Sequence, residues 1–294
     1  MRPIVSRLTH LRENMSTDYN EPLRAIAAWL KTQQIYAHIP SLSAGVVAGQ
    51  ELVWSAAFGF ADLELKTPAT DRTIYSICSI SKLFTSIAIL QLRDGGQLDL
   101  DDDIREHLPW FNIRQAHPRS APITLRSLLT HSSGLPRESE FAYWTDRAFP
   151  FPDQTQLRSS LSQQKTVYPA STAYDYSNLG MALLGDVVAV RSGMPYEAYV
   201  IEHILEPLGL ADTRPELPAS LRRDRLATGY GMAAPDGSRE ALACFRAKAL
   251  ASAVGFSSTV RDLARFAAWH GSQAKLTADP TDSHAEDEGD HLRQ

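Results

Sequence analysis

The chain has 294 residues, of which 44% are hydrophobic and 21% are charged, as is typical of a globular enzyme with a large core. Its formal net charge of −5 excludes a broad basic surface, which argues against nucleic acid as a partner. No apolar run approaches the ~20 residues that a membrane-spanning helix needs.

The N-terminal segment 1–20 carries basic residues but neither a continuous apolar stretch nor a small-residue cleavage site. It therefore lacks the pattern of a secretory signal. The two cysteines, Cys78 and Cys244, are too few for a disulfide framework, and we interpret both as reduced packing residues. These features predict a cytoplasmic protein.

The first expected elements are a helix and a hairpin. Pro22 suits the first turn of an amphipathic helix over residues 21–36. Two apolar segments, 42–48 and 51–62, flank Gly49-Gln50, and such a pair indicates a two-residue hairpin turn. A short strand at 74–75 should then lead into a helix.

That helix is expected to end at Gly95-Gly96, a usual C-terminal signal. Thr124 is an N-cap candidate for a short helix, and glycine-terminated patterns over 178–193 and 195–209 predict two more helices. Strand-like character returns weakly after the segment RLATGY, residues 225–230.

Thr259 and Asp262 resemble the capping box of a last helix. The pattern as a whole predicts a discontinuous sheet-and-helix domain over 21–97 and 216–272, interrupted by a helical subdomain at 98–215. An N-terminal extension, 1–20, precedes it. The acidic segment 273–294 is predicted to be a disordered tail, since it holds few sizeable apolar residues.

The stretch ICSISKLFTSIAIL, residues 77–90, places Lys82 in a helix that is apolar almost all the way round. Such a helix belongs in the interior, where an ammonium group is costly to desolvate. Ser79 lies one helical turn before Lys82, so their side chains should meet. A lysine with a lowered pKa can take the proton from a serine nucleophile. This spacing also arises about once by chance in such a chain, so a solvated helix end is the alternative.

A second candidate group precedes the helix expected from residue 178. Tyr176 and Asn178 flank Ser177, and residues two apart point to the same side of an extended backbone. A tyrosine can relay a proton and an amide can hold a substrate carbonyl. On these residues alone, the favoured interpretation is that Asn178 caps the helix and Tyr176 packs.

Other polar residues indicate structural roles. No acidic residue is placed to form a triad with His131, for which a core or capping role is favoured. The acidic run 101–103 is expected to cap the next helix rather than to bind metal. No group of histidines and cysteines has zinc-ligand spacing.

Six segments from residue 38 to 270 occur in the order and rough spacing of the penicillin-recognising serine hydrolases: SISK, HSSGLP, YSNLGMALLG, PLGLADT, LATGY and SSTVRDLARF. The chain resembles the branch of the class C β-lactamases, with their relatives among esterases, D-aminopeptidases and D-alanyl-D-alanine carboxypeptidases. The resemblance implies an α+β fold of the β-lactamase/transpeptidase type. In that fold an antiparallel sheet with flanking helices adjoins a helical subdomain, and the active site lies between them.

The resemblance also implies roles for four residues. Ser79 would be the acylated nucleophile, with Lys82 and Tyr176 jointly moving its proton, and Asn178 would contact a substrate amide. The implied reaction is acyl transfer to serine followed by hydrolysis, with no cofactor. The expected substrate is a small ester, amide or β-lactam; an ester or amide is favoured over cell-wall peptide, which would require export.

One departure from the family pattern stands out. The H-x-G or K-T-G motif of the family is expected downstream of SSTVRDLARF, and the sequence 270–294 contains neither. The sheet is therefore expected to be incomplete at its C-terminal side, with an edge that favours a homodimer, and turnover is expected to be weak. The alternative function is a non-catalytic binding or scaffold protein, against which the retention of all four site residues argues.

Overall fold

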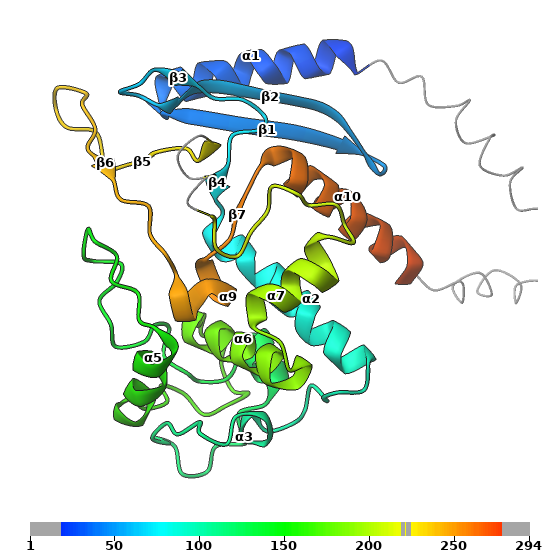
Figure 1. Ribbon diagram of the computed structural model, residues 1–294, viewed down its shortest axis with the longest axis vertical. Helices are drawn as coiled ribbons and strands as arrows, with labels where there is room; N and C mark the ends of the chain where they lie inside the picture. Colours follow the sequence, from blue (N-terminus) through cyan, green and yellow to red (C-terminus); the bar gives the residue numbers. More distant parts are fainter. Residues whose placement is uncertain (1–18, 219–220, 222–224, 278–294) are drawn as a thin grey trace, which may run out of the picture.

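A computed structural model describes residues 19–218, 221 and 225–277. A three-stranded antiparallel sheet in the order β1-β2-β3 lies between two helices (Figure 1). Its strands are β1 (Ser41–Ala48), β2 (Glu51–Asp62) and β3 (Thr67–Pro68). Helix α1 (Asn20–Tyr36) covers one face of the sheet, and α10 (Val260–Thr277) covers the other.

The predicted hairpin is confirmed. Strands β1 and β2 pair up to Ala48 and Glu51, so Gly49 and Gln50 form the two-residue connection. Gly49 has a φ of +62°, in the left-handed region that favours glycine. The register shifts between Val46 and Val47, where the strand carries an irregularity of the kind that bends a sheet.

The helix that bears Lys82 follows a short strand, as expected, but it is not buried all round. Strand β4 (Tyr75–Ser76) pairs with β7 (Ser257–Ser258); a one-turn 3₁₀ helix η2 (Cys78–Ile80) then leads into α2 (Ser81–Asp94). Ile80 is 40% exposed and Leu83 is 49% exposed, so the all-round burial inferred from their apolarity is wrong. They lie on the face of the turn that holds Ser79, which is also exposed.

The central part of the chain is helical. It contains α3 (Ile104–His107), α4 (Leu125–Leu129), α5 (Gln154–Ser160), the 3₁₀ turn η3 (Leu161–Gln163), α6 (Asn178–Ser192), α7 (Tyr196–Val200) and the π-helical turn η4 (Ile201–Leu205). The predicted caps are confirmed: Asp103 begins α3 and Thr124 begins α4, each within a capping box. Gly193 ends α6 with a φ of +70°.

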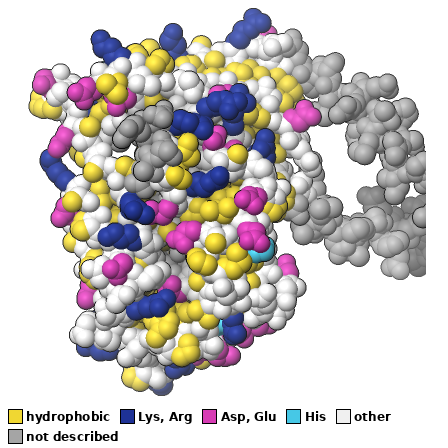
Figure 2. Space-filling model, viewed as in Figure 1, with side chains coloured by type: hydrophobic (Ala, Val, Ile, Leu, Met, Phe, Trp, Pro, Cys, Tyr) yellow, Lys and Arg dark blue, Asp and Glu magenta, His cyan; other side chains and the backbone are white. Residues whose placement is uncertain are grey.

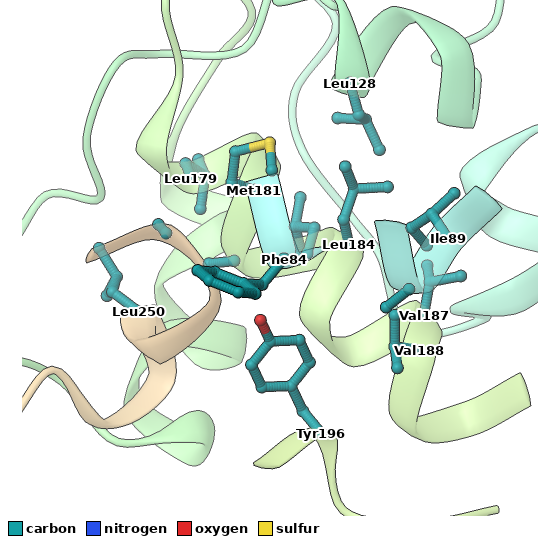
Figure 3. Packing of buried hydrophobic residues seen from close by; sticks show 14 of the residues in the cluster. Phe84, Ile89, Leu128, Leu179, Met181, Leu184, Val187, Val188, Tyr196 and Leu250 are labelled. Atoms are coloured by element: carbon teal, nitrogen blue, oxygen red, sulfur yellow. The ribbon is translucent and has the colours of Figure 1, made fainter. Parts of the chain in front are cut away.

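The main core joins α2, α6 and α9 (Ala251–Val254), and Figure 3 shows part of it. Phe84 of α2 stacks on Phe256 at 4.8 Å between ring centroids. Tyr196 directs its hydroxyl into this cluster, where it lies 2.6 Å from the Thr85 hydroxyl. Each large apolar side chain buried here stabilises the fold by about 1.5–3 kcal/mol. The core therefore contains residues from both predicted domains, and the division at residues 97 and 215 stays a prediction.

The C-terminal part returns to the sheet. The 3₁₀ turn η5 (Lys248–Leu250) precedes α9, and the short strands β5 (Gly229–Tyr230) and β6 (Ala241–Leu242) pair with each other. Helix α10 continues to Thr277, so residues 273–277 are helical rather than part of a disordered tail. The rest of that predicted tail, 278–294, and residues 1–18 of the predicted extension lie outside the described residues.

The described residues form no membrane-spanning helix, and the face in Figure 2 carries no charged stripe. Within residues 19–218, 221 and 225–277, no helix is both long and apolar enough to cross a bilayer. On the face that Figure 2 shows, acidic and basic side chains are interspersed. Neither cysteine forms a disulfide; Cys78 is half-buried, but Cys244 is exposed, so its predicted packing role is wrong.

Candidate active site

Ser79 lies in the 3₁₀ turn η2, which leads into α2. Its neighbour Cys78 has a φ of +42°, an uncommon conformation for a non-glycine residue. The Cys78 carbonyl accepts a hydrogen bond from the Ser81 hydroxyl, which in turn accepts one from the Phe256 N–H at 3.0 Å. These contacts hold the turn against Phe256, the residue just before β7, while the Ser79 side chain stays exposed.

Lys82 lies beneath Ser79 with all three of its ammonium donors used. Its Nζ donates to Ser79 Oγ at 3.3 Å, to Asn178 Oδ1 at 2.8 Å and to the Ala253 carbonyl at 2.8 Å. Burial lowers the pKa of Lys82 to about 8, and the Glu138 carboxylate opposes this shift. With that pKa, about a tenth of the lysine is neutral at pH 7, and only the neutral amine can accept a proton.

Tyr176 is the second residue of the site that bonds to Ser79. Its hydroxyl donates a hydrogen bond to Ser79 Oγ at 2.8 Å. The ring is held by two cations, since Lys82 Nζ lies 4.7 Å and Arg137 Cζ 5.0 Å from its centroid. The serine oxygen therefore has a lysine and a tyrosine within hydrogen-bond distance.

His131 supports this tyrosine and does not contact the serine. Its Nδ1 accepts a hydrogen bond from the Ser177 N–H at 3.2 Å, and its ring centroid is 4.5 Å from that of Tyr176. Burial and the charge of Lys82 lower the pKa of His131, which favours the neutral imidazole that this bond requires. The predicted structural role of His131 agrees with this geometry.

The cap of α6 is Ser177, so the interpretation of Asn178 as a helix cap is wrong. The Ser177 hydroxyl accepts from the Gly180 N–H at 2.9 Å and donates to the Pro136 carbonyl at 2.7 Å. Ser177 has an extended backbone, which turns its two neighbours to the same side, as expected. Asn178 is the first residue of α6 and is 4% exposed.

Glu138 also belongs to the site, and the sequence reasoning missed it. Its Oε1 accepts from Asn178 Nδ2 at 2.7 Å, and its Oε2 accepts from the Tyr143 hydroxyl. Burial and the carboxylate raise the pKa of Tyr143. The signal was available, because Glu138 lies two residues after the end of the HSSGLP segment that the resemblance singles out.

A cavity of about 510 Å³ lies beside the start of η2. Its lining is largely apolar, with Phe149, Leu226 and Phe245 among the side chains. Ser76 is the lining residue nearest to Ser79 in the sequence, and none of the four predicted site residues lines the cavity. Among the residues that the structure describes, no group of three or more His, Cys, Asp or Glu side chains could hold a metal ion.

Comparison with known proteins identifies the family of this chain. The sequence model of the family described as "Beta-lactamase" matches residues 26–291. The chain belongs to the β-lactamase family. Among curated β-lactamase relatives, "Beta-lactamase-like protein 2" of Dictyostelium discoideum is 35% identical over 178 residues, which cover 60% of this chain and 32% of that protein. "Protein flp" of Staphylococcus aureus strain MW2 is 30% identical over 178 residues, 60% of this chain and 35% of that protein.

Solved structures of the β-lactamase family confirm the predicted fold. The octameric penicillin-binding protein homologue from Pyrococcus abyssi has a TM-score of 0.73 and 26% identity, over 85% of this chain and 56% of that one. A class C β-lactamase from Rhodobacter sphaeroides has a TM-score of 0.65 and 26% identity, over 82% and 63%. EstCE1, a hydrolase with promiscuous acyltransferase activity, has a TM-score of 0.69 and 25% identity, over 83% and 71%. The chain spans about a third of the length of the curated relatives above.

Proposed function

We propose that this β-lactamase-family chain is a serine hydrolase that forms an acyl-enzyme on Ser79. One observation carries the proposal: Ser79 Oγ lies 3.3 Å from Lys82 Nζ and 2.8 Å from the Tyr176 hydroxyl. A serine hydroxyl becomes nucleophilic when a neighbouring base removes its proton, and both groups are within reach of it. A solvated lysine at a helix end would not be 8% exposed with three acceptors around it.

The reaction has two halves. In the first, the Lys82–Tyr176 pair takes the proton of Ser79, whose Oγ forms a bond to the substrate carbonyl carbon. The bond to the leaving group breaks, and the pair returns the proton to that group. In the second half the pair takes a proton from water, and the water oxygen forms a bond to the acyl carbon. The ester bond to Ser79 then breaks, and the pair returns the proton to Ser79 Oγ. We assign the base role to Lys82 and Tyr176 together.

We propose a small ester, amide or β-lactam as the substrate, and favour an ester or amide with an apolar group. The support is the exposure of Ser79, which leaves the nucleophile open to a small molecule. The largely apolar cavity that begins at Ser76, three residues before Ser79, would hold the apolar group. The structural relatives EstCE1, a hydrolase, and a β-lactamase/D-alanine carboxypeptidase from Yersinia pestis agree with this substrate range. The cytoplasmic location, the homodimer and the weak turnover stay predictions.

Covalent labelling tests the proposal. The protein is incubated with a fluorophosphonate or with penicillin, and the mass of the intact chain and of its peptides is measured. We expect one adduct on Ser79, its loss in Ser79→Ala, and its retention in the matched control Ser159→Ala, an exposed serine of α5. A chain that stays unmodified by both reagents, or is modified at another residue, would overturn the proposal in favour of a non-catalytic binding or scaffold protein.

A further inference from the structure

We propose that Glu138 is a positioning residue of this site: its carboxylate fixes the orientation of the Asn178 amide and, through that amide, holds Lys82 against Ser79. The inference rests on the proposed function, since it concerns the lysine assigned there. Among the described residues, no hydrogen bond joins Glu138 to Ser79. Its effect on the position of Lys82 passes through the Asn178 amide, which bonds to both.

The two charged neighbours of Asn178 decide which way its amide points. A carboxylate only accepts hydrogen bonds and an ammonium group only donates them, whereas an amide has one end of each kind. Asn178 Nδ2 faces Glu138 Oε1 at 2.7 Å, and its Oδ1 faces Lys82 Nζ at 2.8 Å. The flipped amide would set its NH₂ against the ammonium and its oxygen against the carboxylate. Glu138 therefore selects the orientation in which Asn178 accepts from Lys82.

Glu138 is itself held by the buried part of its loop. The hydroxyl of Tyr143 donates to Oε2, and the Tyr143 side chain is fully buried and stacks on Phe151 at 4.4 Å between ring centroids. The Asn178 N–H donates to the Arg137 carbonyl at 2.8 Å, which ties the same loop to the start of α6. A carboxylate anchored in this way can impose a fixed geometry on a neighbour.

The charge of Glu138 also acts on the protonation of Lys82. The titratable and charged groups that face the lysine are Cys78 from η2, Tyr176 before α6, and His131, Arg137 and Glu138 from the segment after α4. Among these, the Glu138 carboxylate acts most strongly to raise the pKa of Lys82, against the effect of burial. Removing its charge should therefore move deprotonation of the lysine to lower pH.

The test compares Glu138→Gln with the matched control Glu140→Gln, which removes the same charge from an exposed position two residues on. The rate of Ser79 labelling by a fluorophosphonate and kcat/KM for a p-nitrophenyl ester are measured against pH. We expect Glu138→Gln to lower the maximal labelling rate about tenfold. The acidic limb of the profile, where the rate rises as Lys82 loses its proton, should move to lower pH by about one unit. Glu140→Gln should leave both the rate and the limb unchanged.

A second variant separates positioning from stability. Glu138→Asp keeps the charge but withdraws it by one methylene, so the limb should stay near its wild-type position while the maximal rate falls. If Glu138→Gln labels as fast as wild type, or loses rate only in proportion to a lowered melting temperature with no shift of the limb, the positioning role is wrong. If wild type labels on Ser79 but Glu138→Gln behaves in either of these two ways, only the positioning role is refuted. If wild type never labels, the positioning role and the proposed function are both refuted.

Discussion

The ammonium group of Lys82 donates a hydrogen bond to the carbonyl oxygen of Ala253 at 2.8 Å, across 171 residues of chain. Ala253 lies in α9, which packs against both α2 and α6. The lysine is therefore held between three helices, with Asn178 Oδ1 of α6 as its second fixed acceptor. The third donor of the ammonium group then bonds to Ser79. The packing of these helices therefore fixes where Nζ lies.

Ser79→Ala should abolish hydrolysis and covalent labelling without unfolding the protein. Ser79 is exposed, so the lost hydroxyl leaves no cavity, whereas removal of a nucleophile costs several orders of magnitude in rate. Turnover of a p-nitrophenyl ester and the melting temperature measure the two effects. A variant that keeps wild-type turnover would show that another residue is the nucleophile.

Lys82→Arg should be nearly as damaging as Lys82→Ala. Arginine keeps the positive charge but does not give up its proton in this pH range, so it cannot serve as a base. Its larger head must also fit where Asn178 and Ala253 now hold the ammonium group. The quantity to compare is kcat/KM for the same ester in the two variants; substantial activity in Lys82→Arg alone would rule out proton transfer by Lys82.

The acidic limb of kcat/KM should lie near pH 8 in the wild type. Burial lowers the pKa of Lys82 from its usual 10.5 to about 8, and activity rises as the ammonium group loses its proton. A pH–rate profile from pH 6 to pH 10 with a substrate that does not titrate measures the limb. A rate that is flat across this range would mean that Lys82 does not carry the proton.

The same shift predicts how the free energy of unfolding depends on pH. The folded-state pKa of Lys82 lies below its unfolded value, so between about pH 8 and 10.5 the unfolded chain binds more protons than the folded one. The stability of wild type relative to Lys82→Met should therefore rise with pH through this window and be constant below it. Urea unfolding of both proteins at several pH values tests the sign, and a difference that falls with pH would contradict it.

Ser177→Ala should cost about 1–2 kcal/mol of stability, because it removes the cap of α6 and a buried partner of the Pro136 carbonyl. Activity should fall as well, since Ser177 fixes the backbone between Tyr176 and Asn178. Urea unfolding and ester turnover measure the two effects. Thr172→Ala, an exposed residue whose hydroxyl bonds only within its own turn, is the control and should change neither.

The sequence determined the parts of this protein that depend on near neighbours. Gly49 makes the hairpin turn because its positive φ is local, and the caps at Asp103 and Thr124 bond to N–H groups two or three residues away. The spacing of Ser79 and Lys82 brought their side chains together for the same reason, because one helical turn separates them.

Only the tertiary structure decided what surrounds that pair. Asn178, Ala253 and Glu138 lie far from Lys82 in the chain, and no periodicity relates them to it. The packing of α2 on α6 and α9 brings Asn178 and Ala253 within hydrogen-bond distance of Lys82, and Glu138 bonds to the Asn178 amide. The exposure of Ile80 in η2 and Leu83 in α2 was likewise decided by which faces of these two elements the rest of the chain covers. Local hydrogen bonds and turn geometry depend on adjacent residues, so the sequence alone predicts them. The burial of Lys82, which lowers its pKa, arises only when segments distant in the chain pack together and exclude water.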